Sequence, residues 1–104
     1  MSTETTIGEK LRELREDKKL PLRKVSALLD IDVAILSKME RGERKLSKEI
    51  VLKLAEIYEY NPDELLVLFL SDRIMHEIQD EDLGLEALKV AEERVKYNAT
   101  NIKK

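Results

Sequence analysis

The fold follows from residues 22–45, which read LRKVSALLDIDVAILSKMERGERK. Apolar residues recur every three or four positions on both sides of a central Asp-Ile-Asp, which predicts two short amphipathic helices joined by a tight turn. Asp30 can adopt a left-handed backbone conformation, Asp32 is a suitable N-cap, and Gly42 is suited to the position just after a helix. We therefore expect one helix before this turn and one between Asp32 and Gly42.

Three more helices are predicted around this pair, which itself covers 22–29 and 33–41. Thr6 and Glu9 form a capping-box pattern at the start of a helix over 7–19, which Pro21 ends. Ser47 starts a helix to about residue 59, and Asn61-Pro62 with the acids after it starts a fifth. The residues that we expect to be buried are Ile7, Leu11, Leu14, Val25, Leu28, Leu29, Leu36, Met39, Ile50, Val51, Leu54 and Ile57.

Length and composition limit the chain to a small helical protein. With 104 residues it forms one domain, or one domain with an appendage. It is 42% hydrophobic but has only 2 Pro and 3 Gly, which leaves few turns for an all-β fold. We predict an all-α fold of five helices followed by a further helical segment.

Few residues are available for catalysis or for metal and cofactor binding. The chain has no Cys and one His, which excludes disulfides, cysteine zinc sites and a Cys nucleophile, and His76 is expected to be a surface or packing residue. Asp80, Asp82 and Gly84 lack the remaining ligand positions of a calcium loop. The longest apolar run, 65–70, is too short to span a membrane, and Met1–Thr6 lacks the pattern of a secretion signal. We expect a cytoplasmic protein that is not an enzyme and binds no cofactor or metal.

Charge is unevenly distributed along the chain. The net charge is −3, but residues 1–48 hold 12 Lys and Arg against 9 Asp and Glu, whereas residues 49–104 hold 7 against 13. Between 33 and 48 there are five basic residues, with Glu40 and Glu43 as the acids. A local basic patch of this kind is what contact with phosphates requires, whatever the total charge.

The segment after residue 66 has the pattern of a helical extension. Residues 65–70 are all apolar, so almost two turns of the fifth helix are apolar on every side, more than four short helices can cover. A sixth helix over about 83–97 carries apolar residues at spacings of three and four. Burial within the monomer core would explain the apolar run, but we favour pairing with a second copy. The residues that we expect at this dimer interface are Leu68, Phe69, Ile74, Met75, Ile78, Leu85, Leu88 and Val95.

The stretch quoted above resembles the DNA-binding domains of the Cro and phage-repressor (XRE-like) helix-turn-helix family. The most specific part is ILSKMERGER at 35–44, and LKLAEIY at 52–58 and NPDELL at 61–66 are similar to the family's fourth and fifth helices. Leu22 stands where the family often has a phosphate-anchoring Gln, which leaves that anchor to Arg23 or Lys24. Ser26 and Asp30 replace a usual Ala and Gly, and both substitutions are compatible with the turn.

The resemblance implies a λ-repressor-like DNA-binding domain over residues 7–66, preceded by a flexible tail, 1–6, and followed by a helical dimerisation extension, 67–104. It implies a sequence-specific, homodimeric regulator of transcription, of the repressor type, acting on an inverted repeat in double-stranded DNA. The implied base contacts are Val33, Ala34, Ser37 and Lys38. The implied phosphate contacts are Arg23, Lys24, Arg41, Arg44, Lys45 and Lys48.

A narrower resemblance covers the C-terminal part. The acidic residues 80–82 followed by LEALKVAEE at 85–93 are similar to small bacterial regulators found beside DNA methyltransferase or restriction genes. No segment is large enough to enclose a small-molecule effector, so control by protein concentration or by a protein partner is expected. The alternative is a protein-interaction module, antitoxin-like or adaptor-like, with weak or no DNA binding. The acidic total charge and the missing Gln favour that alternative slightly.

Overall fold

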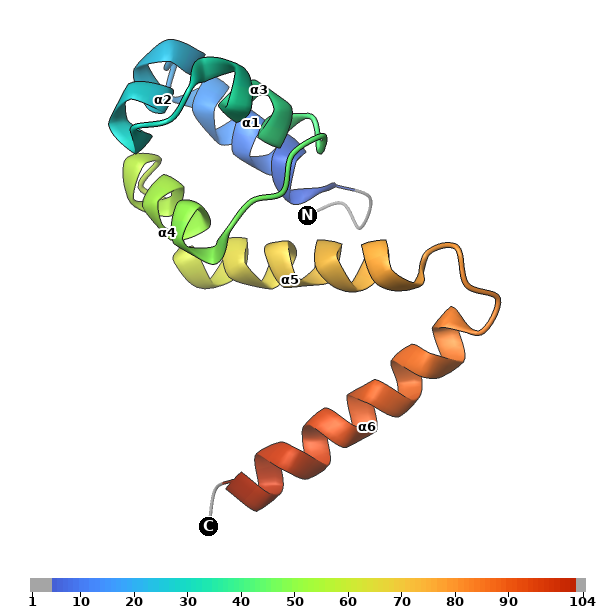
Figure 1. The fold of residues 1–104 in the computed structure, drawn as a ribbon. Helices are drawn as coiled ribbons and strands as arrows, with labels where there is room; N and C mark the ends of the chain where they lie inside the picture. The colour runs from blue at the N-terminus through green and yellow to red at the C-terminus, as the bar shows by residue number, and fades with distance from the viewer. Residues whose placement is uncertain (1–4, 103–104) are drawn as a thin grey trace. The chain divides into compact units, whose positions relative to one another are not determined.

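The computed structural model describes residues 5–102, which contain helices and no strand (Figure 1). The all-helical architecture predicted from the sequence is therefore confirmed. The helices are α1 (Ile7–Asp17), α2 (Leu22–Leu29), α3 (Val33–Glu40), α4 (Lys48–Ile57), α5 (Pro62–Ile78) and α6 (Gly84–Ile102). The chain divides into two compact units, Met1–Asp72 and Arg73–Lys104, and the dividing line falls inside α5.

The predicted helix starts are confirmed by their caps. Thr6 Oγ1 accepts a hydrogen bond from Glu9 N at 3.1 Å, and Glu9 Oε1 accepts one from Thr6 N at 3.0 Å, which completes the capping box of α1. Asp32 accepts from Ala34 N at 2.7 Å, and Ser47 accepts from Ile50 N at 3.1 Å. Each side chain satisfies an amide that the first turn of its helix would leave unpaired.

Helix ends differ more from the prediction. α1 stops at Asp17 and α4 at Ile57, both two residues early, because Lys19 and Glu59 adopt left-handed backbone conformations with φ of 57° and 52°. Asp30 and Gly42 are left-handed as predicted, with φ of 57° and 77°. α6 continues to Ile102, beyond the predicted end at residue 97.

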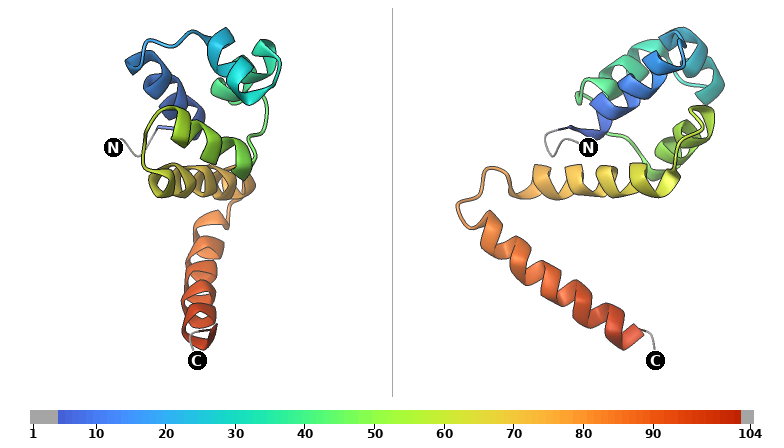
Figure 2. Two further views of the ribbon diagram at one scale, coloured as in Figure 1. Left: turned by 90° about the vertical axis from the view of Figure 1, so that its left-hand side faces the viewer. Right: turned by 180° about the vertical axis from the view of Figure 1, so that it is seen from behind.

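The core of the first unit lies between α1, α2, α3, α4 and the first turns of α5 (Figure 2). Nine of the predicted core residues are buried: Ile7, Leu11, Leu14, Val25, Leu29, Leu36, Met39, Val51 and Leu54. The prediction for Leu28 is wrong, because its side chain is 60% exposed. Ile50 and Ile57 are half-buried at the edge of the core, and Tyr58, which was not predicted, is fully buried.

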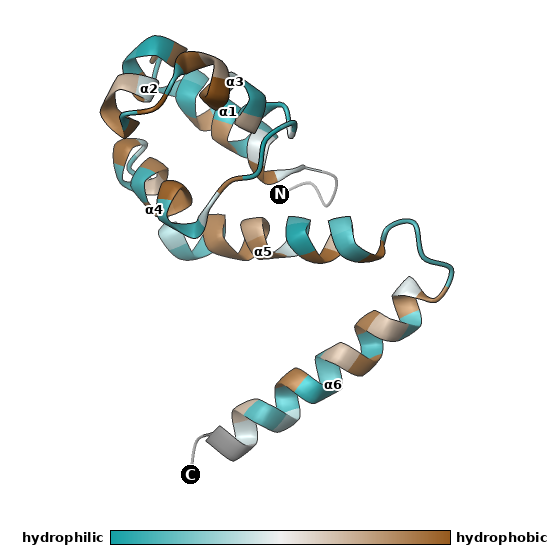
Figure 3. Ribbon diagram, in the orientation of Figure 1, coloured by the Kyte–Doolittle hydropathy of each residue, from teal (hydrophilic) through white to brown (hydrophobic). Residues whose placement is uncertain are grey.

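α5 has one buried and one exposed apolar face. The first part of α5 is largely apolar (Figure 3). Leu65 and Phe69 lie in the core, whereas Val67 and Leu70 are 68% and 52% exposed. Phe69 was expected at a dimer interface, but its contacts with the core leave it only 5% exposed, so it cannot serve there in this structure. On the buried side Asp72 Oδ2 accepts a hydrogen bond from Ile7 N at 2.7 Å, which ties α5 to the start of α1.

Candidate nucleic-acid interface

α3 presents one face to the core and the other to solvent. Leu36 and Met39 are 1% and 6% exposed and hold the helix against the rest of the unit. Three of the four predicted base-contacting residues are exposed, and the fourth, Ser37, is half-buried. At 100° per residue, positions 33, 34, 37 and 38 share the side of α3 opposite Leu36 and Met39. The sequence-predicted residues are thus brought together on a single surface.

The turn before α3 holds this face in place. Asp30, at φ 57° and ψ 44°, reverses the chain after α2, and its amide donates to Ala27 O at 3.1 Å. The next amide, of Ile31, donates to Ser26 O at 3.0 Å. Ser26 is buried and its hydroxyl donates to Arg23 O at 3.0 Å, so it is a packing residue. These bonds satisfy the last carbonyls of α2 and fix the direction in which α3 leaves.

The predicted phosphate-contacting side chains are all exposed, and they lie on α2, at the end of α3 and on the segment that follows it. Arg23 and Lys24 lie in the first turn of α2, and Arg41 caps the end of α3. Arg44 and Lys45 lie in the following loop, and Lys48 begins α4. Arg41 Nε is 3.2 Å from Glu43 Oε2, but both side chains are more than half exposed. An exposed pair of this kind contributes little free energy and can exchange its partner for a phosphate.

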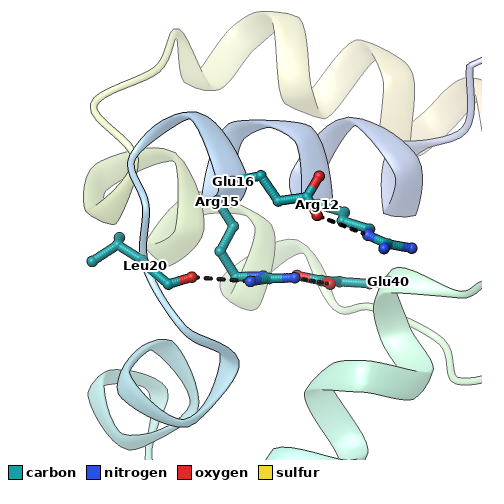
Figure 4. A network of polar contacts seen from close by, with 5 residues as sticks. All are labelled: Arg12, Arg15, Glu16, Leu20 and Glu40. Atoms are coloured by element: carbon teal, nitrogen blue, oxygen red, sulfur yellow. Dashed lines mark hydrogen bonds and ion pairs between the residues drawn. The ribbon is translucent and has the colours of Figure 1, made fainter.

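Glu40 does not contribute its negative charge to this basic surface. Its carboxylate is buried and accepts two hydrogen bonds from Arg15, from Nε at 2.8 Å and from Nη2 at 3.1 Å (Figure 4). Arg15 Nη1 donates to Leu20 O at 2.9 Å, and the hydrogen bond to Glu40 raises the pKa of Arg15. The acid that remains exposed between residues 33 and 48 is Glu43. The surface is therefore more basic than a count along the sequence indicates.

Comparison with known families identifies the domain. A family model described as helix-turn-helix matches residues 11–65, which is more than half of the chain. The chain belongs to the XRE family of helix-turn-helix proteins. The match runs from within α1 into the first turn of α5 and includes the turn between α2 and α3. The resemblance seen in the sequence is thus confirmed, and at the level of the family the protein is a DNA-binding transcription regulator. No curated protein matches the sequence.

The structure adds two contacts of the XRE domain that the sequence analysis missed. One is the Arg15–Glu40 ion pair, which joins α1 to the last residue of α3. The other is the close approach of Gly8, where a Cβ atom would lie 2.5 Å from Glu40 O and 2.8 Å from Met39 O. The ion pair had no local signal because its members are 25 residues apart. Gly8 did carry a local signal, because glycine inside a helix is unfavourable and indicates that another backbone lies too close for a side chain.

Residues 5–102 of this XRE protein offer neither a metal site nor a membrane-spanning helix. No group of three or more His, Cys, Asp or Glu side chains in that range could hold a metal ion. None of the helices in that range is both long and apolar enough to cross a bilayer. XRE-family domains are typically without enzymatic activity.

Proposed function

We propose that the protein is a sequence-specific, double-stranded DNA-binding regulator that acts in the cytoplasm as a homodimer on an inverted-repeat site. The observation that carries this proposal is the exposed face of α3, with Lys38 on it and exposed basic side chains on α2 and on the segment that follows α3. In the major groove Lys38 can donate to guanine O6 and N7, and Ser37 can donate to several acceptors. Val33, 42% exposed, and Ala34 are suited to contact with a thymine methyl group.

The basic residues around α3 would position the domain on the phosphates. Arg44, Lys45 and Lys48 extend from the segment that follows α3. On the other side α2 begins after Pro21, which has no side-chain acceptor for the first amides of the helix. Those amides, with Arg23 and Lys24 beside them, would bind a phosphate where related domains use Gln. Contacts of this kind fix the register of the protein on DNA without reading the sequence.

We propose that the protein dimerises through apolar residues of α5 and α6 that remain accessible to solvent in the described range, 5–102. Ile74, Met75, Leu85 and Val95 are between 47% and 65% exposed, and Ile78 and Leu88 are half-buried. Leu68 is half-buried at the edge of the core and would lie at the margin of such an interface. Phe69 is left out because it belongs to the core. In this proposal residues 7–66 bind DNA, the tail 1–6 precedes them, and residues 67–104 bring two copies together.

Selection from a random pool of duplex DNA at about 0.15 M salt tests the proposal. Sequencing of the bound fraction should reveal an inverted repeat with half-sites roughly 34 Å, one helical turn, apart. Enrichment of one isolated half-site would support DNA reading but not the dimer. If a folded sample enriches no sequence, the proposal is wrong, and the alternative of a protein-interaction module built on the acidic residues 80–82 and the apolar helices replaces it.

A further inference from the structure

α6 has a second apolar face that the proposed dimer interface does not use. Leu83, Val90 and Tyr97 follow one another at intervals of seven residues and are 67%, 58% and 68% exposed. Leu83 directly precedes α6, and its carbonyl accepts the hydrogen bond of Ala87 N at 2.9 Å. Seven residues make almost two full turns, so the three side chains lie in one line along the helix. Val90 and Val95 are about 140° apart around the axis, which separates this face from the one containing Leu88.

A partner is needed for this face. Between Leu85 and Thr100 every side chain is exposed except that of Leu88, which is half-buried. Most helical stability in proteins comes from packing an apolar face against another element rather than from the helix alone. Apolar residues alternate with polar ones along much of α6 (Figure 3). Two apolar faces on one helix are typical of a helix that contacts two neighbours.

We propose that α6 pairs with the α6 of a second copy, in antiparallel orientation, through the face formed by Leu83, Val90 and Tyr97. This inference rests on the homodimer of the proposed function and specifies how part of it is built. The arrangement of the sequence around Val90 supports it, because Leu83 and Tyr97 are each seven residues from Val90. A two-fold axis at Val90 would place Leu83 beside the partner's Tyr97, and Val90 beside the partner's Val90.

Charge favours a second copy in this orientation over other occupants. Glu86 and Arg94 border the apolar face, each four residues from Val90, and neither forms an ion pair with another residue in the range 5–102. They are about 12 Å apart along their own helix, too far to pair with each other. The antiparallel arrangement brings each Arg94 to the level of the partner's Glu86, with its own Glu93 beside it. Each guanidinium would then lie between two carboxylates.

The parallel orientation lacks this complementarity. It would place Arg94 against the partner's Arg94 within the contact, where two guanidinium groups repel. A charged residue at a seam position commonly determines the orientation and register of paired helices. Arg94 thus disfavours one orientation and supports the other. The existing Lys96–Glu92 pair, with 3.2 Å between Nζ and Oε1, lies on the opposite side of α6 and is left intact.

A charge exchange in the full-length protein tests the pairing, with the dimer dissociation constant measured by sedimentation without DNA. Arg94→Glu would leave three carboxylates together at each end of the contact, and it should raise the dissociation constant about tenfold or more. The double variant Glu86→Lys with Arg94→Glu should restore it to within about threefold of the wild type. The matched control, Glu56→Lys with Arg94→Glu, has the same net charge but changes an exposed residue of α4, so it should remain weakened.

Cysteine pairing gives an independent test of orientation, since the chain has no native Cys. Oxidation of a mixture of Leu83→Cys and Tyr97→Cys proteins should give a disulfide between the two variants, and neither variant alone should cross-link. Cross-linking of Leu83→Cys with itself would establish the parallel orientation and overturn the proposal.

Other outcomes separate this inference from the proposed function. If Arg94→Glu leaves the dimer dissociation constant unchanged, the α6 pairing is wrong. The same follows if the control substitution restores dimerisation of Arg94→Glu as well as Glu86→Lys does. Neither result would contradict DNA binding. A wild-type protein that is monomeric yet selects a DNA sequence would also overturn the α6 pairing and leave DNA binding untouched. Dimerisation with the expected rescue, but with no DNA sequence selected, would support the pairing and refute the proposed function.

Discussion

Lys38 and Arg44 carry the same charge but have different roles in the proposed complex. Lys38 lies on the exposed face of α3, whereas Arg44 lies in the loop after it. We expect Lys38→Ala to relax base preference and cost about 1 to 3 kcal/mol on the selected site. Arg44→Ala should weaken binding to all sequences similarly and reduce the salt slope by about one. Affinities for the selected and a scrambled duplex over a salt series measure both effects. Sequence-independent losses of equal size from the two variants would contradict the assignment of Lys38.

Tyr58 makes the stability of the domain sensitive to alkaline pH. Burial raises the pKa of Tyr58 above its ordinary value of 10.0, and the nearby charge of Glu40 raises it further. Below pH 10 both the folded and the unfolded state hold the phenolic proton. Above it the unfolded state releases the proton and the folded state keeps it, so the free energy of unfolding should fall by about 1.4 kcal/mol per pH unit.

Urea unfolding between pH 8 and 11 measures this loss. Tyr58→Phe should remove most of it, whereas Tyr97→Phe, at an exposed position, should not. The Tyr58 hydroxyl has no hydrogen-bond partner within the part of the chain that the structure describes. Tyr58→Phe should therefore also keep or raise stability at neutral pH, by up to about 1 kcal/mol. An unchanged alkaline loss in Tyr58→Phe would show that another group is responsible.

The contact between α1 and the end of α3 depends on Gly8. Alanine is the better helix former by about 1 kcal/mol, so propensity alone would favour Gly8→Ala. The added Cβ, however, would meet backbone oxygen atoms of Glu40 and Met39, which cannot move without moving α3. We expect Gly8→Ala to destabilise the domain by about 1 to 3 kcal/mol in chemical denaturation, as overpacking usually does. Glu13→Ala, at an exposed position of the same helix, is the control and should have little effect. A stabilised Gly8→Ala would mean that α1 and α3 are not in close contact.

The helices were largely predictable because their signals are local. Caps such as Thr6, Asp32 and Ser47 act within three residues, so their hydrogen bonds can be read from spacing. The ends after Asp17 and Ile57 were missed because left-handed Lys19 and Glu59 carry no sequence signal that a glycine would give. Periodicity marks an apolar stripe but not its width, and for this reason Leu28 was placed in the core.

The candidate site was predictable to the same extent. Positions 33, 34, 37 and 38 were chosen from the family resemblance, and a period of 3.6 residues places them on one face of α3. The compensation of Glu40 by Arg15 could not be read from the sequence, because it depends on how α1 packs against α3. Long-range pairs of this kind decide how basic the surface is, and only the three-dimensional structure places them.

α5 connects the two functions proposed for the protein. Leu65 and Phe69 anchor it in the core, and Asp72 accepts a hydrogen bond from the first amide of α1. Because it lies at the start of α1, the Asp72 carboxylate also interacts favourably with the dipole of that helix. The exposed Val67 and Leu70 lie on the side of the helix away from these contacts. A single helix can therefore bind a second copy on one side without losing its contacts with the DNA-binding domain on the other.

Ile74 and Phe69 should separate association from folding. Ile74 is 47% exposed, so Ile74→Lys should leave each domain folded while raising the dimer dissociation constant about tenfold or more, because a charge would enter the apolar contact. Phe69→Ala removes a core side chain and should instead cost about 3 to 5 kcal/mol of folding stability.

DNA binding by Ile74→Lys then reports on the dimer. Two linked domains bind an inverted repeat more tightly than one because the second contact is intramolecular, whereas a single half-site gains nothing from the link. Affinity for the full repeat should fall, and affinity for an isolated half-site should stay within about twofold of the wild type. Sedimentation measures the dimer dissociation constant, circular dichroism measures folding, and titrations on the two duplexes measure the DNA affinities. An Ile74→Lys protein that remains dimeric and binds the repeat like the wild type would remove α5 from the interface and leave α6 to hold the two copies together.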